Sequence, residues 1–171
     1  MKRAVAGWLL LLSLVAGCRK ESPWISYTSP EGRYTILLPE QPKLKSQQAT
    51  GADGSTFQQY LAMASDSSGA FYAAGYFDIG GSNFSFDKAR DGAVRGGTLL
   101  AERAITLGNY PGREVKFLTK DPNGHEGFVV ARFYHVEQRV YIVQYIVPSS
   151  AGQDLPEKAV KYFDSFQVTG H

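Results

Sequence analysis

Histidine is the side chain best suited to bind a metal ion or move protons near neutral pH, and this chain has three of them. His125 and His135 fall on one predicted strand, about 34 Å apart at about 3.4 Å per residue, so they cannot share an ion. The third is His171. No pair of cysteines or histidines has the short spacing of a zinc site. The sequence therefore predicts no metal site.

Nucleophilic catalysis would need an activated serine or cysteine. The Gly-x-Ser-x-Gly elbow of serine hydrolases is absent, and the serines of residues 66–69 stand in a run that is typical of a turn. One alternative stays open, a small exported hydrolase in which the fold brings His125 or His135 against a distant serine and a carboxylate.

Carboxylate pairs and phosphate loops are equally unconvincing as sites. Asp87 and Asp91 stand four residues apart in a predicted helix, a spacing typical of a solvated, charged face. The glycine pairs at residues 80–81 and 96–97 lie at helix boundaries and match no phosphate-binding pattern. We expect no catalytic residue and no cofactor.

Arg132 is the candidate binding residue, because it interrupts an otherwise apolar face of a predicted strand. The apolar members of that face are Phe128, Val130, Tyr134 and Val136. One explanation is an ion pair with Glu114 or another acid at the rim of the sheet. The other is a ligand anchor in a cleft, because a partly buried guanidinium binds carboxylates and phosphates well.

Two neighbouring predicted strands are rich in aromatic side chains. These are Tyr60, Phe71, Tyr72, Tyr76 and Phe77. Most such residues pack in a core or pair across strands. The alternative is an open aromatic groove for a hydrophobic ligand or peptide.

Nine segments have the alternation and composition of β-strands. They are residues 24–27, 33–39, 43–50, 56–65, 70–79, 98–107, 113–120, 127–136 and 139–147. Short links, residues 108–112 among them, join the last four and predict an antiparallel meander. Residues 43–50 are predicted to be an edge strand, where lysines discourage pairing with other chains. The last two segments are apolar on both faces, so both faces must be covered.

Two helices are predicted to supply that cover. The first begins after Ser85, a good N-cap, and ends at Gly96, with a narrow apolar face suited to packing on a sheet. The second is expected to begin with a capping box of Asp154 and Glu157. Its apolar stripe consists of Leu155, Ala159, Tyr162, Phe163 and Phe166.

The single cysteine, Cys18, directly follows an apolar run. Residues 1–17 have the basic, apolar and small-residue order of a secretory signal peptide, and the apolar part is shorter than the roughly 20 residues of a membrane span. The four residues 15–18 resemble the lipobox of bacterial lipoproteins. That resemblance implies cleavage between Gly17 and Cys18 and a diacylglyceryl group on the sulfur, with palmitate among the acyl chains. Two or three such chains make a stable anchor.

Arg19 follows the cysteine, where aspartate commonly marks retention in the inner membrane of Gram-negative bacteria. The resemblance therefore favours a lipid anchor in the outer membrane, facing the periplasm. Residues 18–23 would form the lipidated tether and residues 24–168 a single α+β domain. Loss of residues 1–17 lowers the 18 basic residues to 16, against 16 acidic ones, for a net charge of zero. A neutral domain lacks the basic surplus of a nucleic-acid binder.

The order of elements resembles the Mog1/PsbP-like α/β/α sandwich over residues 24–168. The resembling features are residues 34–39, residues 110–114, Arg132, Tyr141 and residues 163–166. The resemblance implies an antiparallel meander sheet of about 7–9 strands, with an inserted helix and a C-terminal helix packed on it. Members are mostly binding or assembly modules, namely a photosystem accessory subunit, a nuclear-transport regulator and exported bacterial proteins without assigned activity.

We therefore expect an exported lipoprotein that acts as a non-enzymatic binding or assembly module, with the membrane and a protein as partners and no nucleic acid. The hydrolase described above is one alternative. The other is a carrier of a hydrophobic ligand, which would need an apolar cavity of about 300 Å³ or more between helix and sheet.

Overall fold

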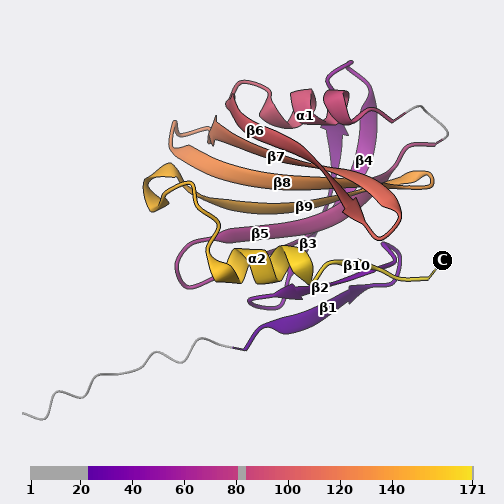
Figure 1. Ribbon diagram of the computed structural model, residues 1–171, viewed down its shortest axis with the longest axis horizontal. Helices are drawn as coiled ribbons and strands as arrows, with labels where there is room; N and C mark the ends of the chain where they lie inside the picture. The colour runs from indigo at the N-terminus through magenta and orange to yellow at the C-terminus, as the bar shows by residue number, and fades with distance from the viewer. Residues whose placement is uncertain (1–22, 81–83, 171) are drawn as a thin grey trace, which may run out of the picture.

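The computed structural model shown in Figure 1 describes residues 23–80 and 84–170. The expected signal segment lies outside the described residues, together with Gly17, Cys18 and His171. Neither helix of the described part is long and apolar enough to cross a membrane.

Seven antiparallel strands form the main sheet, in the spatial order β3-β4-β5-β9-β8-β7-β6. Their bounds are β3 Lys43–Thr50, β4 Thr56–Ser65, β5 Phe71–Asp78, β6 Thr98–Leu107, β7 Tyr110–Lys120, β8 Glu126–Val136 and β9 Arg139–Pro148. The predicted meander is confirmed from β6 to β9, where each strand pairs with the next. β5 pairs with β9, so the segment that carries helix α1 (Phe86–Val94) crosses to the far edge of the sheet. β3 and β6 are consequently the two edges, as predicted for residues 43–50.

Three further strands form a second, smaller sheet in the order β1-β2-β10. They are β1 Ile25–Ser29, β2 Tyr34–Leu38 and β10 Gln167–Val168. The α+β class is confirmed, but the first two strands stand apart from the meander, because β2 turns its apolar face onto the main sheet. The hydroxyl of Tyr34 donates to the carbonyl of Ala74 at 3.1 Å, and the hydroxyl of Tyr141 donates to the carbonyl of Gly32 at 2.9 Å. These buried bonds fix one layer on the other.

Helix α1 lies on one face of the main sheet, and helix α2 (Glu157–Asp164) lies with the small sheet on the other face (Figure 1). Two apolar cores result, and β8 and β9 contribute to both of them. The expectation that both faces of these strands are covered is therefore confirmed. A 3₁₀ turn, Ser149–Ala151, leads from β9 toward α2.

The helix ends show one prediction confirmed and one wrong. Ser85 is the N-cap of α1, and its side chain accepts a hydrogen bond from the Lys88 amide at 3.4 Å. The capping box of Asp154 and Glu157 does not form, because α2 begins at Glu157 itself. Pro156 precedes it, with φ of −67° and no side-chain cap bond. Proline already has the backbone φ that a helix start requires.

The predicted link over residues 108–112 is shorter in the structure. β7 begins at Tyr110, which pairs with Leu107, so the turn consists of Gly108 and Asn109. Gly108 has φ of 58°, a conformation that glycine adopts without strain. The proline and glycine that follow lie within the strand.

Candidate functional site

Among the described residues, neither His125 nor His135 lies beside a serine as a hydrolase would need. His125 is exposed, and its Nδ1 lies 3.1 Å from a carboxylate oxygen of Asp121 in the turn before β8. The His135 ring lies 5.1 Å from that of Phe84, and its Nε2 has no hydrogen-bond partner in the described part of the chain. No serine hydroxyl stands within hydrogen-bond reach of either ring among the described residues. These residues also hold no cluster of three metal-binding side chains.

The predicted turn over residues 66–69 is confirmed, because the Gly69 amide donates to the Asp66 carbonyl at 3.0 Å. Lys158 of α2 donates to the Asp66 carboxylate at 2.6 Å and to the Ser68 hydroxyl at 2.8 Å. An amine that donates in both contacts does not serve as a base for the serine. The cluster instead joins the turn to α2.

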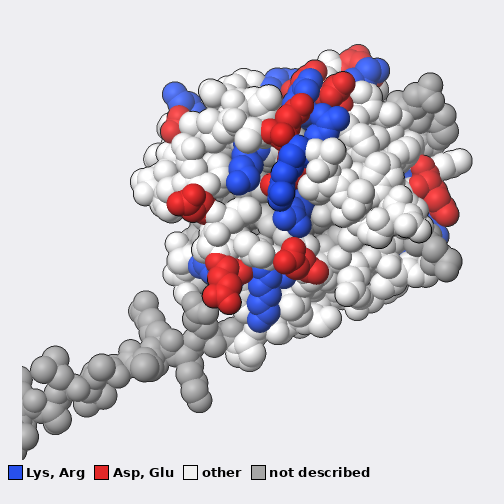
Figure 2. Space-filling model, in the orientation of Figure 1, with Lys and Arg blue, Asp and Glu red and all other residues white. Residues whose placement is uncertain are grey.

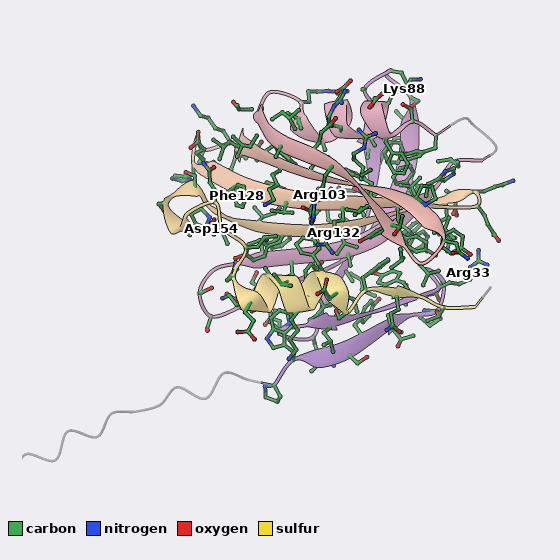
Figure 3. All side chains as sticks on the ribbon, viewed as in Figure 1. Arg33, Lys88, Arg103, Phe128, Arg132 and Asp154 are labelled. Atoms are coloured by element: carbon green, nitrogen blue, oxygen red, sulfur yellow. The ribbon has the colours of Figure 1, made fainter. Side chains whose placement is uncertain are left out.

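Arg132 lies on β8 beneath α2 and is paired with Glu114. Its Nε donates to a Glu114 oxygen at 2.8 Å, and its guanidinium lies 4.4 Å from the centre of the Phe163 ring. Arg103 donates two bonds to the same carboxylate, at 2.9 and 3.1 Å. The three residues lie directly opposite one another on β6, β7 and β8. Figure 3 labels both arginines, which lie close together near α2.

Glu114 is the buried centre of this group, with 2% of its surface exposed. Burial opposes ionisation of its carboxyl, but hydrogen bonds from Arg103 and Arg132 outweigh it and lower the Glu114 pKa below its usual value. Of the two explanations for Arg132, the ion pair with Glu114 is therefore present. Its role as a ligand anchor stays a prediction.

The aromatic residues of β4 and β5 divide between the two faces of the sheet. Tyr72 is fully buried beside α2, at 5.0 Å from the Tyr162 ring, and Tyr60 stacks on Tyr76 at 5.0 Å. On the α1 face, Phe57 stacks on Phe77 at 4.1 Å. The tyrosines thus pack in the core or across strands, whereas the phenylalanine pair borders a hollow.

This hollow has a volume of about 370 Å³ and lies between α1, the β3–β4 hairpin and the main sheet. We call it the α1 groove. Its apolar walls include Phe57, Phe77, Phe133 and Ile142, which come from β4, β5, β8 and β9. Such a cavity between helix and sheet is the feature expected of a hydrophobic-ligand carrier.

Small side chains on α1 leave this space open. Ala89, Gly92 and Ala93 form the helix side of the groove. Ala89 and Ala93 pack against the core that contains the facing phenylalanines, so a larger residue at either of them would enter this space. The sequence predicted a narrow apolar face for this helix. That face packs on the sheet, and its small side chains also leave a cavity beneath the helix.

Two glutamine amides line the groove among its aromatic rings. Gln59 accepts a hydrogen bond from Gln47 at 3.0 Å. The side chain of Gln144 on β9 is half-buried and makes no hydrogen bond with a described residue. An amide with free donor and acceptor groups can hold one polar group of a ligand.

The tip of the β3–β4 hairpin closes over one side of the groove. Lys88 binds the Asp53 carboxylate at 2.9 Å, and Arg95 donates to the Gly51 carbonyl at 2.7 Å. A Cβ placed on Gly92 would lie 3.6 Å from the Ala52 nitrogen, so helix and hairpin are in contact there. Figure 3 labels Lys88 at this end of the molecule.

Local hydrogen bonds shape the tip. The Gly51 amide donates to the Ser55 carbonyl at 2.7 Å, and the Ser55 amide donates to the Asp53 carboxylate at 3.0 Å. The Ser55 hydroxyl and the Lys88 ammonium hold the pKa of the Asp53 carboxyl well below its usual range. The carboxylate thus keeps its charge for the contact with α1 across the physiological pH range.

Sequence patterns did not identify this site. The groove depends on the curl of a hairpin toward a helix, and neither element shows that contact in its own residues. The sequence contains one usable signal. Gln144 is the single polar residue between Val140 and Val147 of β9, a strand whose two faces are both covered. A polar residue in a strand that is covered on both sides indicates a water-filled or ligand-filled space beside it.

The comparisons with known proteins agree with the fold. No protein-family model matches the sequence, and no curated protein matches it. The solution structure of cyanobacterial PsbP (CyanoP) from Synechocystis sp. PCC 6803 matches with a TM-score of 0.55 and 9% identity, over 92% of this chain and 98% of that one. A Pseudomonas aeruginosa protein of unknown function, PA94, matches at a TM-score of 0.41 and 10% identity, over 78% and 96% of the two chains, and we draw nothing from it. The chain therefore has a PsbP-like α+β fold, and a likeness at 9% identity shows the fold alone.

Proposed function

We propose that this protein is an exported, lipid-anchored binding module without enzymatic activity, which holds an apolar ligand in the α1 groove. The observation that supports this proposal is the groove itself. Its volume of about 370 Å³ falls within the range of small-molecule sites, roughly 300–1,000 Å³. Aromatic walls with a few polar groups are the usual composition of such sites.

The charges around the groove favour a neutral ligand. Each charged side chain among its described lining residues is already paired, Lys88 with Asp53 and Asp78 with Arg139. An ionic ligand would have to break one of these pairs or enter without a counter-charge. The amides of Gln59 and Gln144 offer hydrogen bonds to a neutral polar group instead.

Export and anchoring are supported by residues 1–18. Their resemblance to a lipobox signal peptide implies a mature chain that begins at an acylated Cys18 and faces the periplasm from the outer membrane. A tethered domain meets apolar molecules that leave the membrane, and a protein partner would deliver or accept them. A module that assembles only with proteins is the alternative, and it would leave the α1 groove without a ligand.

The test is the identity of what the protein carries. The full chain is produced in a Gram-negative host, purified from membranes and extracted with organic solvent for mass spectrometry. Ala89→Trp fills the groove from the helix side, and Ala104→Trp makes the same change on an exposed position of β6. We expect one apolar compound to be enriched with the native chain and with Ala104→Trp, and lost with Ala89→Trp.

Two outcomes would contradict the proposal. The extracts of all three proteins could hold the same bulk membrane lipids and nothing else. Alternatively, the enriched compound could remain on Ala89→Trp protein whose circular dichroism and melting temperature are native. Ala93→Leu, a milder change of the same wall, replaces Ala89→Trp if that protein does not fold.

A further inference from the structure

The two edges of the main sheet are protected to different degrees. β3 carries Lys43 and Lys45, and such charges discourage an edge strand from pairing with another chain. β6 contains neither lysine nor proline, and its first seven residues are all exposed. Its two charged residues, Glu102 and Arg103, are held in ion pairs within the fold and do not repel an added strand as unpaired lysines do. Leu99 and Leu100 are 43% and 40% exposed. β6 therefore leaves its outer edge available to another strand.

Most of this edge is regular. The register with β7 shifts between Leu99 and Ala101, and from Ala101 to Leu107 each residue has a partner on β7. A bulge itself discourages pairing at the point where it occurs. The available edge is thus the stretch of residues 101–107.

A second hollow, of about 350 Å³, lies beside this stretch on the α2 face of the sheet. Its lining comes from β6, β7 and the segment before α2, and includes Ala101, Arg103, Lys116 and Leu155. The side chain of Arg103 is 64% exposed, so a ligand can reach it. Figure 2 shows basic and acidic side chains in a band that crosses this face of the molecule.

The charges in this region leave a positive surplus. Arg103 and Arg132 share the single carboxylate of Glu114, and Asp164 stands 3.7 Å from Arg132. Lys116 has no ion-pair partner within the described residues. Glu102 also borders this hollow, but its carboxylate lies on the opposite face of the sheet, where it pairs with Arg90 and Arg113. On the α2 face, three cations thus face two carboxylates. A further carboxylate would balance them.

We propose that β6 is a docking edge for an extended, acidic segment of another protein. The segment adds an eighth strand beside residues 101–107 and turns alternate side chains onto the α2 face. A glutamate or aspartate opposite Ala101 or Arg103 reaches the Lys116 ammonium and the outer side of the Arg103 guanidinium. Main-chain hydrogen bonds supply affinity, and the acidic positions supply specificity.

The face of the added strand determines the rest of the recognition. Residues that point to the opposite face lie beside Glu102, Ala104 and Thr106. Glu102 is already paired with Arg90 and Arg113, and the other two are exposed and uncharged. Small or β-branched apolar residues suit those positions. The preferred sequence therefore alternates acidic and β-branched residues over about seven positions. This proposal does not depend on a ligand in the α1 groove.

The test uses the full chain and a fluorescein-labelled octapeptide of alternating valine and glutamate. A second octapeptide has lysine in place of glutamate. Binding is measured by fluorescence anisotropy, and the complex is analysed by hydrogen–deuterium exchange. Lys116→Glu reverses the charge in the hollow, and Lys45→Glu makes the same change on β3, the opposite edge.

We expect the glutamate peptide to bind and the lysine peptide not to bind. Lys116→Glu should weaken binding about tenfold, the factor expected when an attraction of under 1 kcal/mol becomes a repulsion of similar size. Lys45→Glu should leave binding unchanged, and the amides of residues 101–107 should gain protection.

The proposal is overturned if both peptides bind equally, or if the glutamate peptide does not bind at all. Binding that protects β3 rather than β6 would overturn it too, as would equal effects of the two variants. A dimer in sedimentation equilibrium that protects residues 101–107 without peptide would assign the edge to a second copy of this chain. Melting curves of both variants establish that the fold is intact.

Discussion

Replacing Glu114 by glutamine tests whether the buried carboxylate holds three strands and α2 together. The side chain is 2% exposed and accepts bonds from Arg103 and Arg132 at 2.8 to 3.1 Å. Glutamine has nearly the same shape, but it keeps one acceptor oxygen and turns two new donors toward the guanidinium groups. Arg103 can then turn into water, whereas Arg132, at 15% side-chain exposure under Phe163, cannot.

The expected loss of folding free energy in Glu114→Gln follows from the difference in exposure between Arg103 and Arg132. Breaking a buried pair costs about 3–5 kcal/mol, and the exposure of Arg103 places this site near the lower end, about 3 kcal/mol. For a domain of this size, the melting temperature should fall by about 6–12 °C, at about 2–4 °C per kcal/mol. Urea unfolding followed by circular dichroism gives the free energy, and calorimetry gives the melting temperature.

Glu102→Gln is the matched control. Glu102 also pairs with two arginines, Arg90 and Arg113, but it lies on the neighbouring strand β6, on the opposite face of the sheet, and its side chain is 32% exposed. The control should lose at most about 1 kcal/mol, as exposed pairs do. Adding Arg132→Met to Glu114→Gln should recover part of the loss, because it removes the stranded charge. Equal losses for the two glutamines, or no recovery in the double variant, would refute the reasoning.

Three further predictions concern a turn, the hairpin and the N-terminus. Burial opposes the charge of Asp66, but hydrogen bonds led by that of Lys158 lower its pKa from 3.8 to about 2. Because the Asp66 pKa is lower in the folded than in the unfolded chain, its contribution of about 2 kcal/mol to the free energy of unfolding should be present above the pKa of the unfolded chain and lost as pH falls toward 2. Acid-unfolding curves of the native chain and of Asp66→Asn should therefore converge near that pH. Parallel curves would refute this. A disulfide between Ala52→Cys and Gly92→Cys, in a Cys18→Ser background, should slow exchange of the bound ligand relative to the reduced form, as measured with isotope-labelled ligand; equal rates would show that the hairpin does not control entry. Cys18→Ser should remove the protein from the detergent-extracted membrane fraction, and its intact mass by mass spectrometry should lack the acyl chains. An intact mass that differs from the native one only by the cysteine-to-serine change would exclude lipidation at this residue.

Local sequence patterns predicted the elements whose causes are themselves local. Ser85 caps α1 because its hydroxyl serves an amide three residues away. Alternation placed β4 and β6 at residues 56–65 and 98–107, the bounds that the structure has. The apolar character of β8 and β9 on both faces required two covering layers, and two are present.

Features that depend on distant contacts did not follow from the sequence. Side-chain parity assigns residues to faces, but it does not say which strands pair, so the contact of β5 with β9 was not predictable. Three of the five residues predicted for the apolar stripe of α2, Ala159, Tyr162 and Phe163, are buried in the helix, whereas Leu155 precedes it and Phe166 follows it. The prediction of Asp154 as the cap is wrong, because a capping box and a proline start compete at the same residues. For Arg132, the ion pair with Glu114 became evident only once the register of β7 and β8 placed Glu114 opposite it, and the role of ligand anchor stays a prediction.

The α1 groove likewise depends on contacts between distant segments, so the sequence pattern could not predict it as a binding site. Its lining comes from five strands, a hairpin tip and a helix, and each part has an ordinary role when it is considered alone. The sequence pattern indicates Phe77 only as one of several aromatic strand residues, and it gives no sign of a role in binding for Phe133. Only their convergence under Ala89 and Ala93 makes a space in which a ligand can be held.

The most direct test of the central claim is an NMR titration of the full chain with the neutral probe N-phenyl-1-naphthylamine. We expect the largest shifts on the Ile142 methyl groups and on the rings of Phe57 and Phe133, with nuclear Overhauser effects between probe and ring protons, and we expect Ala89→Trp to abolish them. Shifts confined to other surfaces, or unchanged by Ala89→Trp while the fold stays native, would contradict it.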